Sequence, residues 1–162
     1  MWINPARFDK DQKKIILNSD YIFSFSKYDG FSYRLLTIQL LIDYDFNYIL
    51  QMSVFEHENK TKNISNEFQE KGKLPEKIFD YLEILLDSDL KSLKQKYSFW
   101  DYDISDIGSQ RFLINLGDGI EVNINDGLPL EYYFITDLEV FLFDFNEYLK
   151  NWVEDKYQAW IQ

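Results

Sequence analysis

Residues 21–56 read YIFSFSKYDGFSYRLLTIQLLIDYDFNYILQMSVFE, and this stretch decides the expected fold. In residues 21–26 an aromatic side chain stands at every second position, which is the period of a half-buried β-strand. Asp29-Gly30 then supplies a two-residue hairpin signal, because glycine accepts the positive φ that such a turn requires. The stretch therefore begins with a strand that turns back on itself.

Two further strands are predicted after this turn. Residues 33–43, YRLLTIQLLID, form the first, and residues 47–56, NYILQMSVFE, form its antiparallel neighbour across DYDFN. Both are rich in the β-branched, aliphatic and aromatic residues that suit a pleated surface. The simplest arrangement is an antiparallel meander of three strands.

The composition changes after the meander. Residues 57–73, HENKTKNISNEFQEKGK, are polar with both charge signs, which predicts a mobile surface loop. Leu74-Pro75 then opens a helical stretch in which apolar residues recur every three or four positions as far as Tyr97. We expect this helix to break at residues 87–89, Asp-Ser-Asp, and to pack one stripe against the sheet.

The last third of the chain predicts a second hairpin and a long helix. Residues 112–116 and 120–124 alternate apolar and polar side chains on either side of Gly117-Asp118-Gly119. A short strand is expected over residues 132–135. Thr136-Asp137-Leu138-Glu139 matches a capping box, in which the first and last side chains satisfy free N–H groups at a helix start. The helix should run towards Trp160.

The expected fold is a single α+β domain over residues 1–162, with an antiparallel β-sheet (meander plus hairpin) packed against two or three α-helices. A chain of 162 residues with 46% hydrophobic residues is large enough for one substantial core. The chain has no cysteine and only one histidine, His57, so a thiolate metal site or a histidine cluster is excluded. No cofactor or metal is expected.

The N-terminal residues MWINPARFDKDQKK lack the pattern of a signal peptide, and no stretch approaches the roughly 18 apolar residues that span a bilayer. A cytoplasmic location is expected. The net charge of −11 is concentrated late in the chain: residues 1–97 hold 14 Lys/Arg and 15 Asp/Glu, whereas residues 98–162 hold 3 and 13. Such a charge repels nucleic acids and anionic membranes, and it attracts cationic proteins.

The last helix presents two different faces. At 100° per residue, one arc is apolar and should be core: Leu138, Phe141, Leu142, Phe145, Tyr148, Leu149, Trp152 and Val153. The opposite arc combines carboxylates with two apolar residues: Glu139, Asp144, Glu147, Glu154 and Asp155, with Val140 and Phe143. Apolar groups ringed by charge resemble the centre and rim of an interface. The alternative is that Val140 and Phe143 lie under a neighbouring loop or in a second core layer.

Residues 98–108, SFWDYDISDIG, combine carboxylates with aromatic rings and contain no basic residue. An EF-hand loop starting at Asp101 would need glycine where Asp106 stands and glutamate where Phe112 stands, so that assignment fails. The segment could instead dock on a cationic groove, with Asp101, Asp103 and Asp106 as charges and Trp100 and Tyr102 as contact area. The alternative is that the rings point inward and the aspartates are merely solvated.

This profile resembles the immunity proteins of bacterial toxin–immunity pairs, including those of contact-dependent growth inhibition and polymorphic toxin systems. The resemblance rests on a small cysteine-free α+β domain with acidic aromatic stretches, FWDYDISD at 99–106 and DLEVFLFDFNEYL at 137–149. It implies a non-catalytic inhibitor that binds a cognate toxin domain, often a basic nuclease. The expected partner-binding residues are Trp100, Asp101, Tyr102, Asp103, Asp106, Val140, Phe143, Asp144, Glu147, Glu154 and Asp155.

Two other hypotheses remain. The first is a metal-assisted hydrolase that uses Asp101, Asp103 and Asp106, and titration with magnesium, calcium and manganese would discriminate it. The second is a structural adaptor whose apolar patches close a homodimer, which light scattering would detect.

Overall fold

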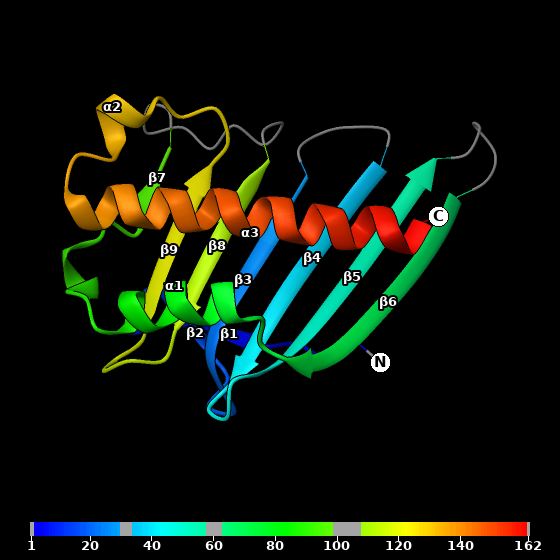
Figure 1. Cartoon of the computed structure of the whole chain (residues 1–162), viewed down its shortest axis with the longest axis horizontal. Helices are drawn as coiled ribbons and strands as arrows, with labels where there is room; N and C mark the ends of the chain where they lie inside the picture. Colours follow the sequence, from blue (N-terminus) through cyan, green and yellow to red (C-terminus); the bar gives the residue numbers. More distant parts are fainter. Residues whose placement is uncertain (1, 30–33, 58–62, 99–107, 162) are drawn as a thin grey trace.

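The computed structural model describes residues 2–29, 34–57, 63–98 and 108–161. Its centre is a seven-stranded sheet with the order β6-β5-β4-β3-β8-β9-β7 (Figure 1). Every neighbouring pair is antiparallel except β7 and β9, which are parallel. The strands are β3 (Tyr21–Tyr28), β4 (Arg34–Asp43), β5 (Asn47–His57), β6 (Asn63–Lys73), β7 (Lys96–Tyr97), β8 (Ser109–Ile114) and β9 (Ile120–Asn125). The predicted meander and the hairpin over residues 112–124 are confirmed.

Two long helices cover one face of this sheet. Helices α1 (Glu76–Leu86) and α3 (Asp137–Ile161) lie side by side in front of the strands, and α3 crosses most of the sheet (Figure 1). The strands point alternate side chains at the helices, and those side chains form a single core with the helices' inner faces. The predicted single domain with a helical layer on a sheet is confirmed, with two long helices. The sheet is mixed rather than purely antiparallel, because β7 pairs parallel with β9. Within the described residues, no helix is both long and apolar enough to cross a bilayer.

A short hairpin lies behind the sheet, and sequence analysis did not predict it. Strands β1 (Ala6–Asp9) and β2 (Lys14–Leu17) pair antiparallel, and β2 contacts β3, β8 and β9. The Asp9 carboxylate accepts backbone N–H bonds from Asp11 and Gln12, which stabilises the turn. Residues 6–17 are too short and too polar for the period-two pattern to be apparent in the sequence alone.

The N-terminal segment is held to the back of the sheet by one buried side chain. Gln51, only 1% exposed, accepts a hydrogen bond from the backbone N–H of Ile3 at 3.0 Å and donates one to its carbonyl at 2.7 Å. The same amide also donates to Gln39 Oε1 at 2.7 Å. Buried amides are tolerated only when they are hydrogen-bonded, so this clamp explains why two glutamines stand in otherwise apolar strands.

The prediction of a mobile polar loop over residues 57–73 is wrong for His57, which ends β5, and for residues 63–73; residues 58–62 lie outside the described residues. Residues 63–73 form β6, which pairs with β5 along its whole length. Backbone hydrogen bonds to β5 hold the strand, and its exposed side chains are polar because only one face meets the helices. On that face Phe68 packs on Trp160, with ring centroids 5.3 Å apart. Two apolar residues in this segment, Ile64 and Phe68, were too few for a pattern-based strand prediction.

Two other predicted elements also differ in the structure. After the expected break at Asp87, the chain forms a 3-10 turn, η1 (Leu90–Ser92), and then β7, so the helix does not resume. The apolar residues Leu90 and Tyr97 are nevertheless buried. The strand expected over residues 132–135 is replaced by a short helical turn, α2 (Leu130–Tyr133). Both differences arise where short apolar runs fit the period of a helix and the period of a strand equally well.

A candidate protein-binding surface on helix α3

Helix α3 begins with the predicted capping box. The Glu139 backbone N–H donates to Thr136 Oγ1 at 3.1 Å, and the Thr136 backbone N–H donates to Glu139 Oε1 at 3.2 Å. These reciprocal bonds satisfy N–H groups that a helix start otherwise leaves free. The capping box is therefore confirmed.

Glu139 is buried, and its expected place on the solvent-facing arc is wrong. Only 6% of the residue is exposed, and its Oε2 accepts a hydrogen bond of 2.6 Å from the Tyr97 hydroxyl. Burial raises the pKa of Glu139, but the hydrogen bonds from Tyr97 and Thr136 outweigh it, so the net pKa lies below its usual value. For Tyr97, burial and the hydrogen bond to this carboxylate raise the pKa above its usual value. The pair ties β7 to the start of α3.

We expect Tyr97→Phe to lower the free energy of unfolding by about 1.5–3 kcal/mol at neutral pH, because it removes a hydrogen bond to a buried carboxylate. The pKa of Glu139 is lowered in the folded state, so its stabilisation is present above its unfolded pKa and is lost as the pH falls through the folded pKa. The difference in unfolding free energy between wild type and Tyr97→Phe should therefore narrow below about pH 4. Urea denaturation at several pH values measures it.

The matched control is Tyr148→Phe, since the Tyr148 ring packs on Tyr81 and its hydroxyl makes no hydrogen bond within the described part of the chain. This control should change stability by less than about 1 kcal/mol at every pH. A constant difference between Tyr97→Phe and wild type from pH 7 to pH 3 would contradict the pKa assignment of Glu139.

The predicted binding residues of α3 lie on one side of the helix. At about 100° per residue, they fall within an arc of about 120° that points away from the core. We call this side the acidic flank; it consists of Val140, Phe143, Asp144, Glu147, Glu154 and Asp155. Asp144 and Asp155 are exposed, whereas Glu147 and Glu154 are partly buried. The structure thus brings together the helical half of the predicted site.

The two apolar members of the acidic flank are not fully exposed. Val140 and Phe143 are partly buried and pack against the core, and the Phe143 ring lies 5.0 Å from the ring of Phe134. Phe134 precedes α3 and is itself 3% exposed. A second core layer under the acidic flank, which was the alternative explanation, therefore accounts for part of these side chains, and only their remaining exposed area is accessible to a partner.

Two lysines, Lys150 on α3 itself and Lys27 on β3, lie close to the partly buried carboxylates. Lys150 Nζ lies 3.2 Å from Glu147 Oε1 and 3.1 Å from Asp126 Oδ1. Lys27 on β3 lies 3.9 Å from Glu154. Burial lowers the pKa of Lys150, but the charges and hydrogen bonds of Asp126 and Glu147 outweigh it and raise the net pKa. Lys150 therefore stays protonated at neutral pH and fixes both carboxylates.

A chain of buried hydrogen bonds leads from the core to this ion pair. Asn146 Nδ2 donates to Gln110 Oε1 at 3.0 Å, and Gln110 Nε2 donates to Asp126 Oδ1 at 2.9 Å. Asn146 and Gln110 are each 1% exposed. Sequence analysis missed these residues, although a single amide inside an apolar helix stripe or strand is the signal that could have found them.

Trp100, Asp101, Tyr102, Asp103 and Asp106 lie outside the described residues. The strands that flank this segment in the chain, β7 and β8, have their adjacent ends at the same end of the sheet. β7 ends at Tyr97, which pairs with Ile124, and β8 begins at Ser109, which pairs with Asn125.

Asp126 connects this end of the sheet to the acidic flank. Its backbone N–H donates to the Gly108 carbonyl at 2.8 Å, while its side chain binds Lys150 on α3. Gly108 immediately follows the segment 99–107 in the chain. Asp126 therefore links Gly108 to Lys150 on α3.

No protein-family model matches the chain, and no curated protein does. The site must therefore be assigned from its own geometry.

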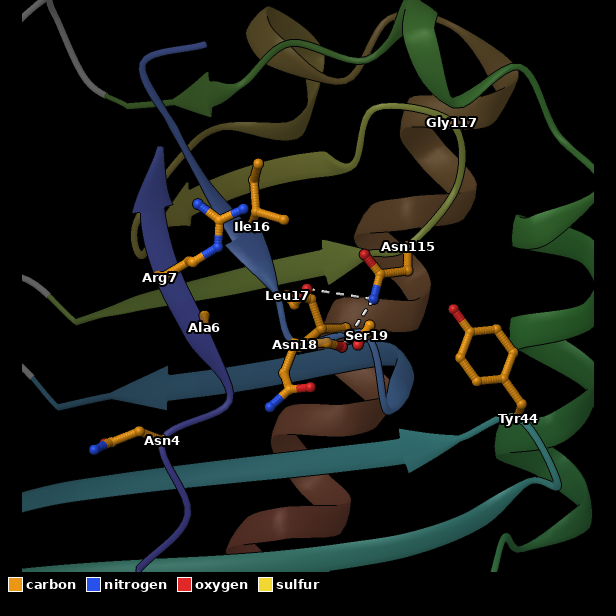
Figure 2. Close-up of a pocket in the computed structure, with 10 residues that line it drawn as sticks. All are labelled: Asn4, Ala6, Arg7, Ile16, Leu17, Asn18, Ser19, Tyr44, Asn115 and Gly117. Carbon is orange, nitrogen blue, oxygen red and sulfur yellow. Dashed lines mark hydrogen bonds between the residues drawn. The ribbon is translucent and has the colours of Figure 1, made fainter. Parts of the chain in front are cut away.

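A pocket lies at the opposite end of the strands. It has a volume of about 660 Å³ and is lined by Asn4, Ala6, Arg7, Ile16, Leu17, Asn18, Ser19, Tyr44, Asn115 and Gly117 (Figure 2). The Asn115 amide donates to the carbonyls of Asn18 at 2.9 Å and Tyr21 at 2.6 Å, so it is used to hold the β2–β3 connection. None of the lining residues is a carboxylate or a histidine.

Metal binding receives no support from the described residues. Among residues 2–29, 34–57, 63–98 and 108–161, no three histidine, cysteine or acidic side chains converge as a metal site would require. The aspartates of the alternative hydrolase hypothesis fall outside these ranges.

Proposed function

We propose that this protein is a non-catalytic inhibitor of the immunity type, which binds and neutralises a cognate cationic toxin domain through the acidic flank and the adjoining segment 99–107. The observation that carries the proposal is the position of the carboxylates. They lie along one side of α3. Lys150 joins Glu147 on this side to Asp126, and Asp126 bonds to Gly108, which follows segment 99–107 in the chain.

The charge balance of α3 supports a cationic partner. The helix has six carboxylates and two lysines, and both lysines already contact carboxylates of this chain, Lys150 at Glu147 and Lys156 at Glu70. The excess negative charge is therefore available to solvent, chiefly at Asp137, Asp144 and Asp155. A concentrated charge of one sign accelerates encounter with an oppositely charged protein and rejects acidic ones.

The rigidity of the acidic flank also supports binding. Glu147 and Glu154 are held by lysines, and the helix beneath them rests on a core of aromatic rings. Side chains that are already ordered lose little entropy when a partner arrives, so more of the interaction energy appears as affinity. Trp100 and Tyr102 would supply the aromatic contact area that interface centres favour.

The experiment that tests the proposal is a rescue assay. Each reading frame next to this gene in its source genome is expressed alone and then together with this chain. We expect at least one to arrest growth, growth to resume on co-expression, and the two purified proteins to form a complex of defined stoichiometry. Growth arrest that co-expression does not relieve, or the absence of any toxic neighbour, would overturn the proposed function.

A further inference from the structure

Strand β6 forms a long outer edge of the sheet. It has eleven residues, Asn63–Lys73, and it is the terminal strand in the sheet order, whereas the opposite edge strand β7 has only two (Figure 1). An outer strand presents a row of N–H and C=O groups that can pair with another strand. The length of β6 makes it the edge best able to accept one.

The register of β6 on β5 determines which backbone groups face outward. The Leu74 N–H donates to the Phe46 carbonyl at 3.0 Å, which continues the regular pairing in which Asn47 stands opposite Lys73. Hydrogen-bonded pairs alternate along an antiparallel ladder, so the even-numbered residues of β6 bond to β5. The odd-numbered residues, including Glu67 and Lys71, therefore point their N–H and C=O groups away from the sheet.

The side chains of Glu67 and Lys71 are also available. Both are exposed on the face of the sheet opposite the helices, and neither forms an ion pair within the described part of the chain. They cannot pair with each other, because four residues of a strand span about 13 Å. Glu67 stands opposite Ser53 of β5, and Lys71 stands opposite Ile49, so neither meets a charge across the ladder on its inner side.

We propose that β6 pairs antiparallel with β6 of a second copy of this chain, about a two-fold axis at residue 69. In this register odd residues oppose odd residues, so the outward backbone groups of Glu67 and Lys71 can bond across the axis. Glu67 then lies opposite Lys71 of the partner subunit, and Lys71 lies opposite Glu67 of the partner subunit. Charged side chains on an edge strand disfavour pairing with most other strands, but they favour pairing with a strand of complementary charge.

Other symmetric registers are less favourable. With the axis at Glu67, Glu70 or Lys71, that residue would stand opposite its own copy, and like charges directly opposite each other destabilise a ladder. With the axis at Phe68, no opposite charges of β6 would meet. Only the register centred on residue 69 pairs both charges favourably.

The end of α3 adds apolar surface beside this edge. Trp160 packs on Phe68 of β6, and the neighbouring Ile161 is 53% exposed (Figure 1). Lys156 also reaches Glu70 on β6, with Nζ and Oε2 3.0 Å apart. Burial of exposed apolar residues near an open strand edge by a second subunit would stabilise the dimer. The ion pair between Asp126 and Lys150 lies near the middle of α3, away from this edge.

Sedimentation velocity of the purified full chain, without any partner, tests the proposal over a range of protein concentrations. We expect a concentration-dependent dimer. Glu67→Lys sets lysine against lysine and Lys71→Glu sets glutamate against glutamate, so each variant alone should weaken dimerisation about tenfold or more. Circular dichroism melting should show both variants folded, because both positions are exposed.

Mixing the two variants gives the decisive measurement. In the mixed dimer, both positions 67 and 71 carry lysine in one subunit and glutamate in the other, so every cross-axis pair again joins opposite charges. An equimolar mixture should therefore dimerise about as tightly as wild type. A wild type that stays monomeric at all concentrations would overturn the proposal, as would a dimer that neither variant weakens or that mixing does not restore. These outcomes leave the proposed toxin binding untouched, because the rescue assay measures growth and heterologous complex formation.

Discussion

Phe145→Ala is expected to lower the free energy of unfolding by about 3–5 kcal/mol, the typical cost of truncating a fully buried aromatic side chain. Phe145 is 0% exposed at the centre of the helical layer. Its ring stacks on Tyr81 of α1 at 4.9 Å and lies 5.8 Å from Phe23 and 5.9 Å from Phe112 in the sheet. One residue therefore joins both helices to two central strands, and close packing leaves no neighbour free to fill the cavity.

Urea denaturation followed by tryptophan fluorescence measures this loss. The matched control is Phe8→Ala, which makes the same substitution at a side chain on β1 that is 61% exposed. The control should cost less than about 1 kcal/mol. If the two variants lost similar stability, α3 would not be packed on the sheet as described.

Asp144→Lys combined with Asp155→Lys is expected to reduce the association rate constant for the cognate toxin domain about tenfold or more at low ionic strength. Both carboxylates are exposed on the acidic flank, so the reversal changes the field that a partner meets and leaves the core unchanged. The dependence of the rate on salt should also flatten, because screening acts on the same long-range attraction. Stopped-flow or surface-based kinetics at several salt concentrations give both quantities.

A variant with the same change in net charge provides the control. Asp20 and Asp118 are also exposed, but they lie in turns at the opposite end of the strands from Asp126. Asp20→Lys combined with Asp118→Lys should leave association near the wild-type rate. Equal slowing by both double variants would show that the total charge of the molecule matters and its position on α3 does not.

Local patterns predicted the elements whose residues carry a repeated signal. The meander over residues 21–56 alternates apolar side chains over three successive strands, and its turns contain residues that favour them. The hairpin across Gly117-Asp118-Gly119 is similar, and both glycines adopt positive φ, at 58° and 90°. The capping box at Thr136 is equally local, since its donors and acceptors lie within four residues.

Elements that depend on distant neighbours could not be predicted in this way. β6 is a strand because β5 offers it a full ladder of backbone partners, which its own polar side chains do not reveal. Glu139 was expected on the solvent side, but Tyr97, which precedes it by 42 residues, covers it and donates to it. The position of the N-terminal segment similarly depends on Gln51, a residue 48 positions after Ile3.

The candidate site shows the same division. The amino-acid sequence by itself determined that α3 has an acidic side and that negative charge gathers late in the chain, because helical period and composition are local properties. Only the tertiary structure decided that the ion pair between Lys150 and Asp126 connects the acidic flank to the end of the sheet. It also decided that the Phe143 ring packs on Phe134. Such pairings depend on which strands and helices meet, and that is set by burying one common core rather than by any single segment.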